Sequence, residues 1–135
     1  MIAGWNEVVG RDDQVWHLGD FAYRAARERV SGLLQKLNGR KHLIIGNNDG
    51  EPTLAADEWE SIGRYAELTL CGVRLVLCHY PFRTWDGMYK GAYNLHGHSH
   101  GKLKPLRHQV DVGVDVWNFR PIDVETIARS KRRPG

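Results

Sequence analysis

Short apolar runs that each end in a cluster of glycine and polar residues recur four times in this chain, and this repetition constrains the fold most. Runs of this length and composition are typical of buried β-strands, and the polar clusters are typical of the loops that follow them. The runs are residues 14–18, 42–45, 73–78 and 92–95, and the clusters begin at Gly19-Asp20, Gly46-Asn47, His79 and His96-Gly97. The sequence therefore predicts a sheet that delivers polar side chains to one edge.

The segments between these runs predict an α/β fold. Apolar residues recur at spacings of three and four from Arg24 to Leu37, which predicts an amphipathic helix ending at Asn38-Gly39. Strand, helix and strand in this order indicate a right-handed parallel crossover. Further elements are a short helix within 52–61, a hairpin of strands 64–70 and 73–78, an alternating strand over 109–116, and a last helix capped by Asp123.

Composition favours one globular domain over residues 1–135. The chain has 135 residues, 41% of them hydrophobic, and no run long enough to span a membrane. Its N-terminus lacks the pattern of a signal peptide, so we expect a cytoplasmic protein with reduced cysteines and no membrane partner. A net charge of +3 with scattered basic residues disfavours nucleic-acid binding.

The residues at the four strand ends form a set of metal-ligand types. The candidate ligands are Asp20, Asn47, His79, His98 and His100. Carboxylate, amide oxygen and imidazole together suit Mn, Fe, Ni, Co or Zn, and the absence of thiolates argues against a structural zinc site. Taken singly each residue is a weak signal, but the set predicts a binuclear type of hydrolytic site.

The ordered pattern G-D, G-N-x-D, H and G-H-x-H resembles the calcineurin-like metallophosphoesterase family, and phage-like bacterial members in particular. It is carried by the stretches VWHLGDF, IIGNND, LCHYPFRTW and LHGHSHG. The resemblance implies a β-sandwich flanked by helices (αββα) and hydrolysis of small phosphate esters by a metal-activated hydroxide. It also implies that Asp20 bridges two metals, that Asn47, His79 and His98 complete one shell, and that His100 serves the other.

Two departures from the family pattern stand out. The family's Asp-x-His motif on the opening strand is absent, and residues 1–6 resemble the helix that follows it. We therefore expect a truncated member without the first strand. We expect it to bind one or two divalent ions, manganese above all. Asn48 replaces a histidine that many members use on the leaving group, which favours phosphodiesters. Asp20, Asn48 and Asp49 are the catalytic candidates, with Asp49 and Asp115 able to support a ligating imidazole.

Alternatives to a working enzyme stay open from the sequence. The missing motif fits a relative that binds metal without turnover. It also fits a self-assembling relative in which a homodimer compensates for the missing strand. Arg83 could contact a substrate phosphate or lie on the surface, and His17, His42, His96 and His108 are interpreted as structural.

Overall fold

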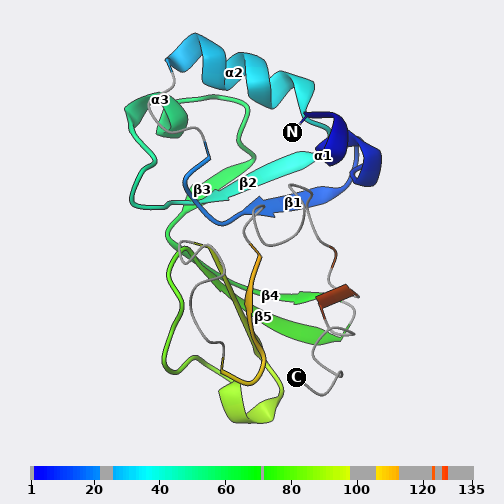
Figure 1. The fold of residues 1–135 in the computed structure, drawn as a ribbon, viewed down its shortest axis with the longest axis vertical. Coiled ribbons are helices and arrows are strands. Elements are labelled where there is room, and N and C mark those ends of the chain that lie inside the picture. The colour runs from blue at the N-terminus through cyan, green and yellow to red at the C-terminus, as the bar shows by residue number, and fades with distance from the viewer. Residues whose placement is uncertain are drawn as a thin grey trace.

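Two separate β-sheets organise the chain (Figure 1). The computed structural model describes residues 2–21, 26–70, 72–97, 106–112, 123 and 126–127. The helices are α1 (Ile2–Val8), α2 (Arg27–Lys36), α3 (Glu51–Leu54) and the 3-10 turn η1 (Met88–Lys90). The strands are β1 (Gln14–His17), β2 (Arg40–Ile44), β3 (Ser61–Gly63), β4 (Tyr65–Leu70), β5 (Val73–Cys78), β6 (Tyr93–His96) and β7 (Gln109–Asp111).

The first sheet is parallel, in the order β1-β2-β3, and its β1–β2 pair confirms the parallel crossover that the strand-helix-strand pattern predicted. The short helix expected within 52–61 is confirmed as α3, which has Pro52 in its first turn and ends at Leu54. The chain then folds inward, with the Trp59 indole donating a 3.0 Å hydrogen bond to the Thr53 carbonyl. Residues 61–63 instead form β3, which the sequence analysis missed because three residues are too few to show a period.

The second sheet has the order β4-β5-β6-β7. The predicted hairpin is confirmed, with Leu70 opposite Val73 in the antiparallel β4–β5 pair. The β5–β6 and β6–β7 pairs are parallel. β7 confirms the start of the strand expected over 109–116, and the rest of that strand lies outside the described residues. Asp123 caps as expected, since its Oδ1 accepts the Thr126 N–H at 2.7 Å.

Alternating side chains hold the layers together. On β2, Leu43 packs with α2 while the next residue, Ile44, packs with Leu75 and Leu77 of the second sheet. Between these two on β5, Val76 faces outward and packs with Trp85 and Ala92. The period of two thus builds one core between the sheets and one on each outer side, confirming an α/β fold.

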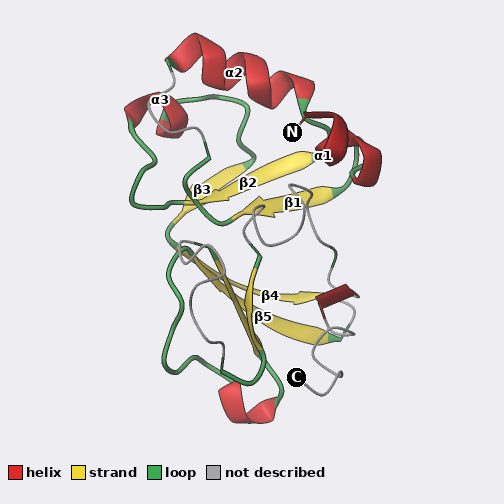
Figure 2. Ribbon diagram, in the orientation of Figure 1, coloured by secondary structure: helices red, strands yellow, loops and turns green. Residues whose placement is uncertain are grey.

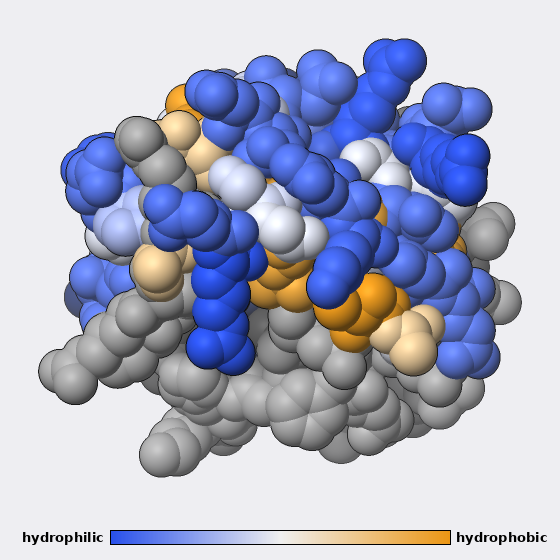
Figure 3. Space-filling view, turned by 90° about the horizontal axis from the view of Figure 1, so that it is seen from above, coloured by the Kyte–Doolittle hydropathy of each residue, from blue (hydrophilic) through white to orange (hydrophobic). Residues whose placement is uncertain are grey.

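The helices α1, α2 and α3 cover the first sheet, and in Figure 2 they lie on its far side from the second sheet. The outward surface over α2 is largely hydrophilic (Figure 3). Among the described residues, the outer face of the second sheet carries the loop with Phe82, Trp85 and Met88 rather than a long helix. None of the helices in the described residues is long and apolar enough to cross a membrane.

Candidate metal centre

The carboxyl ends of β1, β2, β5 and β6 meet where the two sheets face each other, and the predicted polar clusters follow these ends. Asp20 comes first, in a turn where Gly19 has φ +102° and Asp20 itself has φ +56°. A Cβ on Gly19 would overlap His79 Nδ1 and would lie 2.7 Å from the Gly46 Cα. Only glycine therefore lets these loops approach closely enough to aim Asp20 at the other donors.

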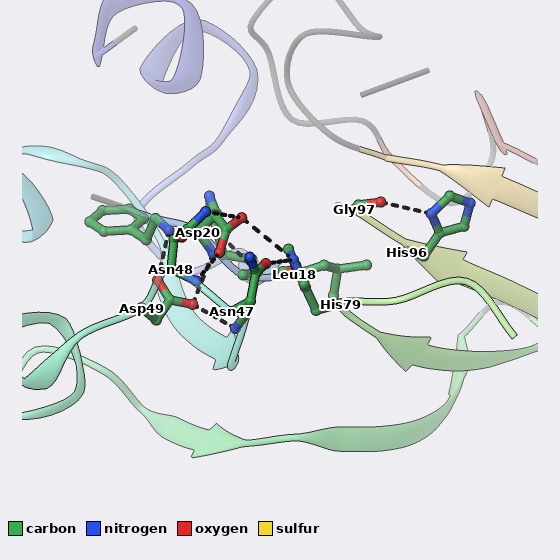
Figure 4. A network of polar contacts seen from close by, with 12 residues as sticks. Leu18, Asp20, Asn47, Asn48, Asp49, His79, His96 and Gly97 are labelled. Atoms are coloured by element: carbon green, nitrogen blue, oxygen red, sulfur yellow. Dashed lines mark hydrogen bonds and ion pairs between the residues drawn. The ribbon is translucent and has the colours of Figure 1, made fainter. Parts of the chain in front are cut away.

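His79, Asn47 and Asp20 converge on one point (Figure 4). The His79 ring is 1% exposed. Its Nδ1 lies 2.6 Å from the Leu18 carbonyl oxygen, which can only accept, so this nitrogen carries the proton. In the neutral ring, Nε2 is then the nitrogen with the lone pair, and it lies 2.9 Å from Asn47 Oδ1 and 3.5 Å from Asp20 Oδ2.

With the ring neutral, an imidazole nitrogen, an amide oxygen and a carboxylate oxygen lie around one position. Neutral imidazole with oxygen ligands is a donor set that divalent transition metals accept. The residues present therefore fit a cation. The backbone carbonyl on Nδ1 is the partner that orients a ligating imidazole in many metal sites.

Asp49 holds together the loop after β1 and the loop after β2. Its carboxylate accepts backbone N–H groups from Asp20 at 2.9 Å, Phe21 at 2.8 Å and Gly46 at 2.7 Å. The sequence analysis expected Asp49 to support an imidazole, but these contacts join the loop after β1 to the loop after β2. Asp49 is therefore an anchor of the backbone that carries Asp20.

Asn48 contacts Asp20 from the solvent side. Its backbone N–H donates to Asp20 Oδ1 at 2.7 Å, and its side-chain amide donates to Oδ2 at 3.3 Å. Both donors orient the same carboxylate. Asn48 is exposed, as is its neighbour Asn47.

His17, interpreted from sequence as structural, lies beside the turn that carries Asp20. Its Nδ1 accepts the Gly19 N–H at 3.2 Å, and burial lowers its pKa to about 4 against the opposing charges of Asp49 and Asp20, so its ring is neutral.

The other histidines make contacts within the fold. His42 lies 2.6 Å from Ser61 Oγ and stacks on Trp16. His96 is buried with Nδ1 2.8 Å from the Gly97 carbonyl, and the His108 ring lies 4.7 Å from that of Tyr93.

Of the other residues predicted for the site, His98, His100 and Asp115 lie outside the described residues, and Arg83 is exposed. Of the two cysteines, Cys71 also lies outside the described residues, and Cys78 is a half-buried free thiol. Within the described ranges, no three His, Cys, Asp or Glu side chains gather as a metal-binding group. The convergent donors there are one histidine, one aspartate and the Asn47 amide.

Comparisons with known proteins place the chain among viral and archaeal relatives. No protein-family model matches it. The Gene 66 protein of Mycobacterium phage D29 is 30% identical over 145 residues (84% of this chain, 73% of that protein), and that of phage L5 is 29% identical over 150 residues (87% and 72%). An uncharacterized protein of Methanocaldococcus jannaschii is 27% identical over 139 residues (96% and 72%).

The fold also occurs in a solved structure. A protein of unknown function from Aquifex aeolicus superposes with a TM-score of 0.73 at 19% identity, covering 96% of this chain and 82% of that one. At this identity the likeness concerns the fold alone. The similarity to the phage D29 protein extends over most of both sequences, and the chain belongs to the family of the mycobacteriophage Gene 66 proteins.

Proposed function

We propose that this chain is a metal-dependent phosphoesterase of the calcineurin-like type that hydrolyses small phosphodiesters. One observation carries the proposal: the His79 Nε2 lies 2.9 Å from Asn47 Oδ1 and 3.5 Å from Asp20 Oδ2, while a backbone carbonyl holds the proton on Nδ1. Imidazole, amide oxygen and carboxylate gathered in this way are ligands for a divalent cation, and the same three residues are the ligands that the family resemblance assigns.

In this proposal Asp20, Asn47 and His79 hold a divalent ion together with His98, and His100 serves a second ion. One or two such ions, manganese above all, supply a hydroxide nucleophile and polarise the phosphoryl oxygens. Asp49 keeps the loops of Asp20 and Gly46 in register through its three backbone contacts.

Asn48 supports the preference for diesters. Its two contacts to Asp20 orient that carboxylate, and an amide cannot donate a proton to a leaving group at neutral pH. Phosphodiesters need this protonation less than phosphomonoesters. We expect Asn48→His to raise the rate on a monoester relative to a diester, and an unchanged ratio would contradict this role for position 48.

The test of the function is hydrolysis of bis(p-nitrophenyl) phosphate and p-nitrophenyl phosphate with added Mn²⁺. Wild type should cleave the diester faster, and His79→Asn and Asn47→Ala should each lose at least about a hundredfold in rate. His42→Asn is the matched control, because His42 lies on β2 among Gln14 and Ser61 rather than at the donor set. Equal rates in His79→Asn and His42→Asn would contradict the proposal.

A second candidate is a relative that binds metal, or assembles with a second copy, without turnover. Two observations support this candidate: β1 is an edge strand of the first sheet as far as the structure describes it, and the sequence has no Asp-x-His motif. One bound metal per chain with no hydrolysis would favour it. A dimeric mass in solution would favour a homodimer in which the second copy compensates for the missing first strand, and a monomeric mass would exclude such a homodimer.

A further inference from the structure

An exposed aromatic ring lies directly beside the donor set. Tyr80 follows His79 in the chain and is 44% exposed. The two rings meet edge to face, with centroids 4.9 Å apart and planes at 79°. The His79 ring is also the one whose Nε2 faces Asn47 and Asp20. An accessible aromatic surface therefore begins one ring away from the atoms that would hold the phosphoryl group.

Tyr80 keeps more of its surface accessible than Tyr93, which is 9% exposed and whose ring lies against that of His108. An aromatic ring that keeps nearly half of its surface accessible can stack on a planar group, and such stacking is tolerant of the group's detailed chemistry.

A phosphodiester bound at the donor set would carry two organic substituents. One leaves in the reaction, and the other stays on phosphorus within a few ångströms of the site. Asn48 is exposed beside Asp20, and the second N–H of its side-chain amide can donate to the edge of a heterocycle. The residues next to the donor set thus include an exposed aromatic ring on His79 and a polar amide on Asp20.

We propose that Tyr80 is a specificity-determining residue that stacks on a planar, aromatic substituent of the phosphodiester. The inference rests on the proposed function and narrows its substrate class to aryl and nucleotide diesters over alkyl diesters. The ring of Tyr80 takes no part in proton transfer in this account; it acts through binding.

The kinetic test uses two esters with the same leaving group. Phenyl p-nitrophenyl phosphate and methyl p-nitrophenyl phosphate differ only in the substituent that remains. Wild type should prefer the phenyl ester in kcat/KM by at least about fivefold beyond the intrinsic ratio measured in buffer, as a single stacking contact allows. Tyr80→Phe should keep this preference, and Tyr80→Ala should lose it.

Tyr89→Ala is the matched control. Tyr89 is 91% exposed on η1, and Figure 1 places that turn at the end of the second sheet away from the first sheet. This variant removes an exposed tyrosine without touching the site, so its preference should equal that of wild type. The same preference in Tyr80→Ala and Tyr89→Ala would overturn the inference.

A binding test separates failure of the inference from failure of the proposed function. Calorimetric titration of the full chain with adenosine 5′-monophosphate and with ribose 5-phosphate compares ligands that share a phosphate and differ in the base. At least about fivefold tighter binding of the adenosine compound, lost in Tyr80→Ala and kept in Tyr89→Ala, supports the aromatic site even if neither ester is hydrolysed. Equal affinities for the two ligands in wild type would overturn it.

Discussion

Asp49→Asn tests whether the Asp49 carboxylate anchors the backbone of the two loops that carry the proposed cation site. Asp49 Oδ2 accepts two of its three backbone N–H groups and Oδ1 accepts the third. An asparagine keeps a single acceptor oxygen, so at least one N–H then meets an NH₂ group, and the other contacts lose the help of the negative charge. Hydrogen bonds to charged groups contribute about 1.5–3 kcal/mol each, so we expect a loss of about 3 kcal/mol in the free energy of unfolding.

This loss should leave the protein folded, because a chain of 135 residues is expected to have about 7–20 kcal/mol of stability. It corresponds to a fall of about 10 °C in Tm. Urea unfolding followed by circular dichroism, in the presence of chelator, measures the free energy of unfolding without any contribution from bound metal. Asp57→Asn changes an exposed aspartate and should stay within about 0.5 kcal/mol of wild type. Equal stabilities for the two variants would refute the anchoring role.

Three further predictions follow from the same contacts. Gly46→Ala should lower stability and Mn²⁺ affinity, since its Cβ would lie 2.6 Å from Asp20 Oδ1, whereas Gly50→Ala should change neither; equal effects would contradict the close approach. The pKa of His17 in the folded protein is about 4, below its unfolded value, so protonation favours the unfolded chain. The free energy of unfolding should therefore fall by about 2 kcal/mol as pH drops from 6.5 to 4. In His17→Gln, measured in chelator, the free energy of unfolding should depend less on pH over this range. Asn94 Oδ1 accepts the Phe82 N–H and a side-chain N–H of Gln109, each at 3.0 Å. Asn94→Ala removes this acceptor from both donors and should lower the free energy of unfolding in urea by about 2–3 kcal/mol; an unchanged free energy would contradict a stabilising role for these two bonds.

Sequence periodicity predicted the elements that alternate or repeat over enough residues. The hairpin of β4 and β5 and the amphipathic part of α2 fall within the predicted ranges, because their apolar spacing reflects the two cores directly. β3 did not show, since its three residues form a strand only by pairing with β2. The end of α3 at Leu54 could not be predicted, because Trp59 turns the chain inward, a tertiary contact that local propensity does not encode.

For the candidate site, too, some features could be predicted from sequence and others could not. The identities of Asp20, Asn47 and His79 as neighbours could be predicted, because parallel strand ends meet at one edge. The role of Asp49 could not, since three backbone N–H groups from two loops carry no sequence signature. Tyr80 is visible in sequence only as one of several aromatic residues, and its exposure beside His79 distinguishes it.

The central claim is that His79, Asn47 and Asp20 form a cation site. Titration of Mn²⁺ into the chelator-stripped full chain by isothermal calorimetry tests it most directly, with His79→Asn beside His42→Asn as the control. The account predicts saturable binding of at least one Mn²⁺ per chain, weakened at least about tenfold by His79→Asn and unchanged by His42→Asn. No saturable binding in wild type, or equal affinity in His79→Asn, would contradict it.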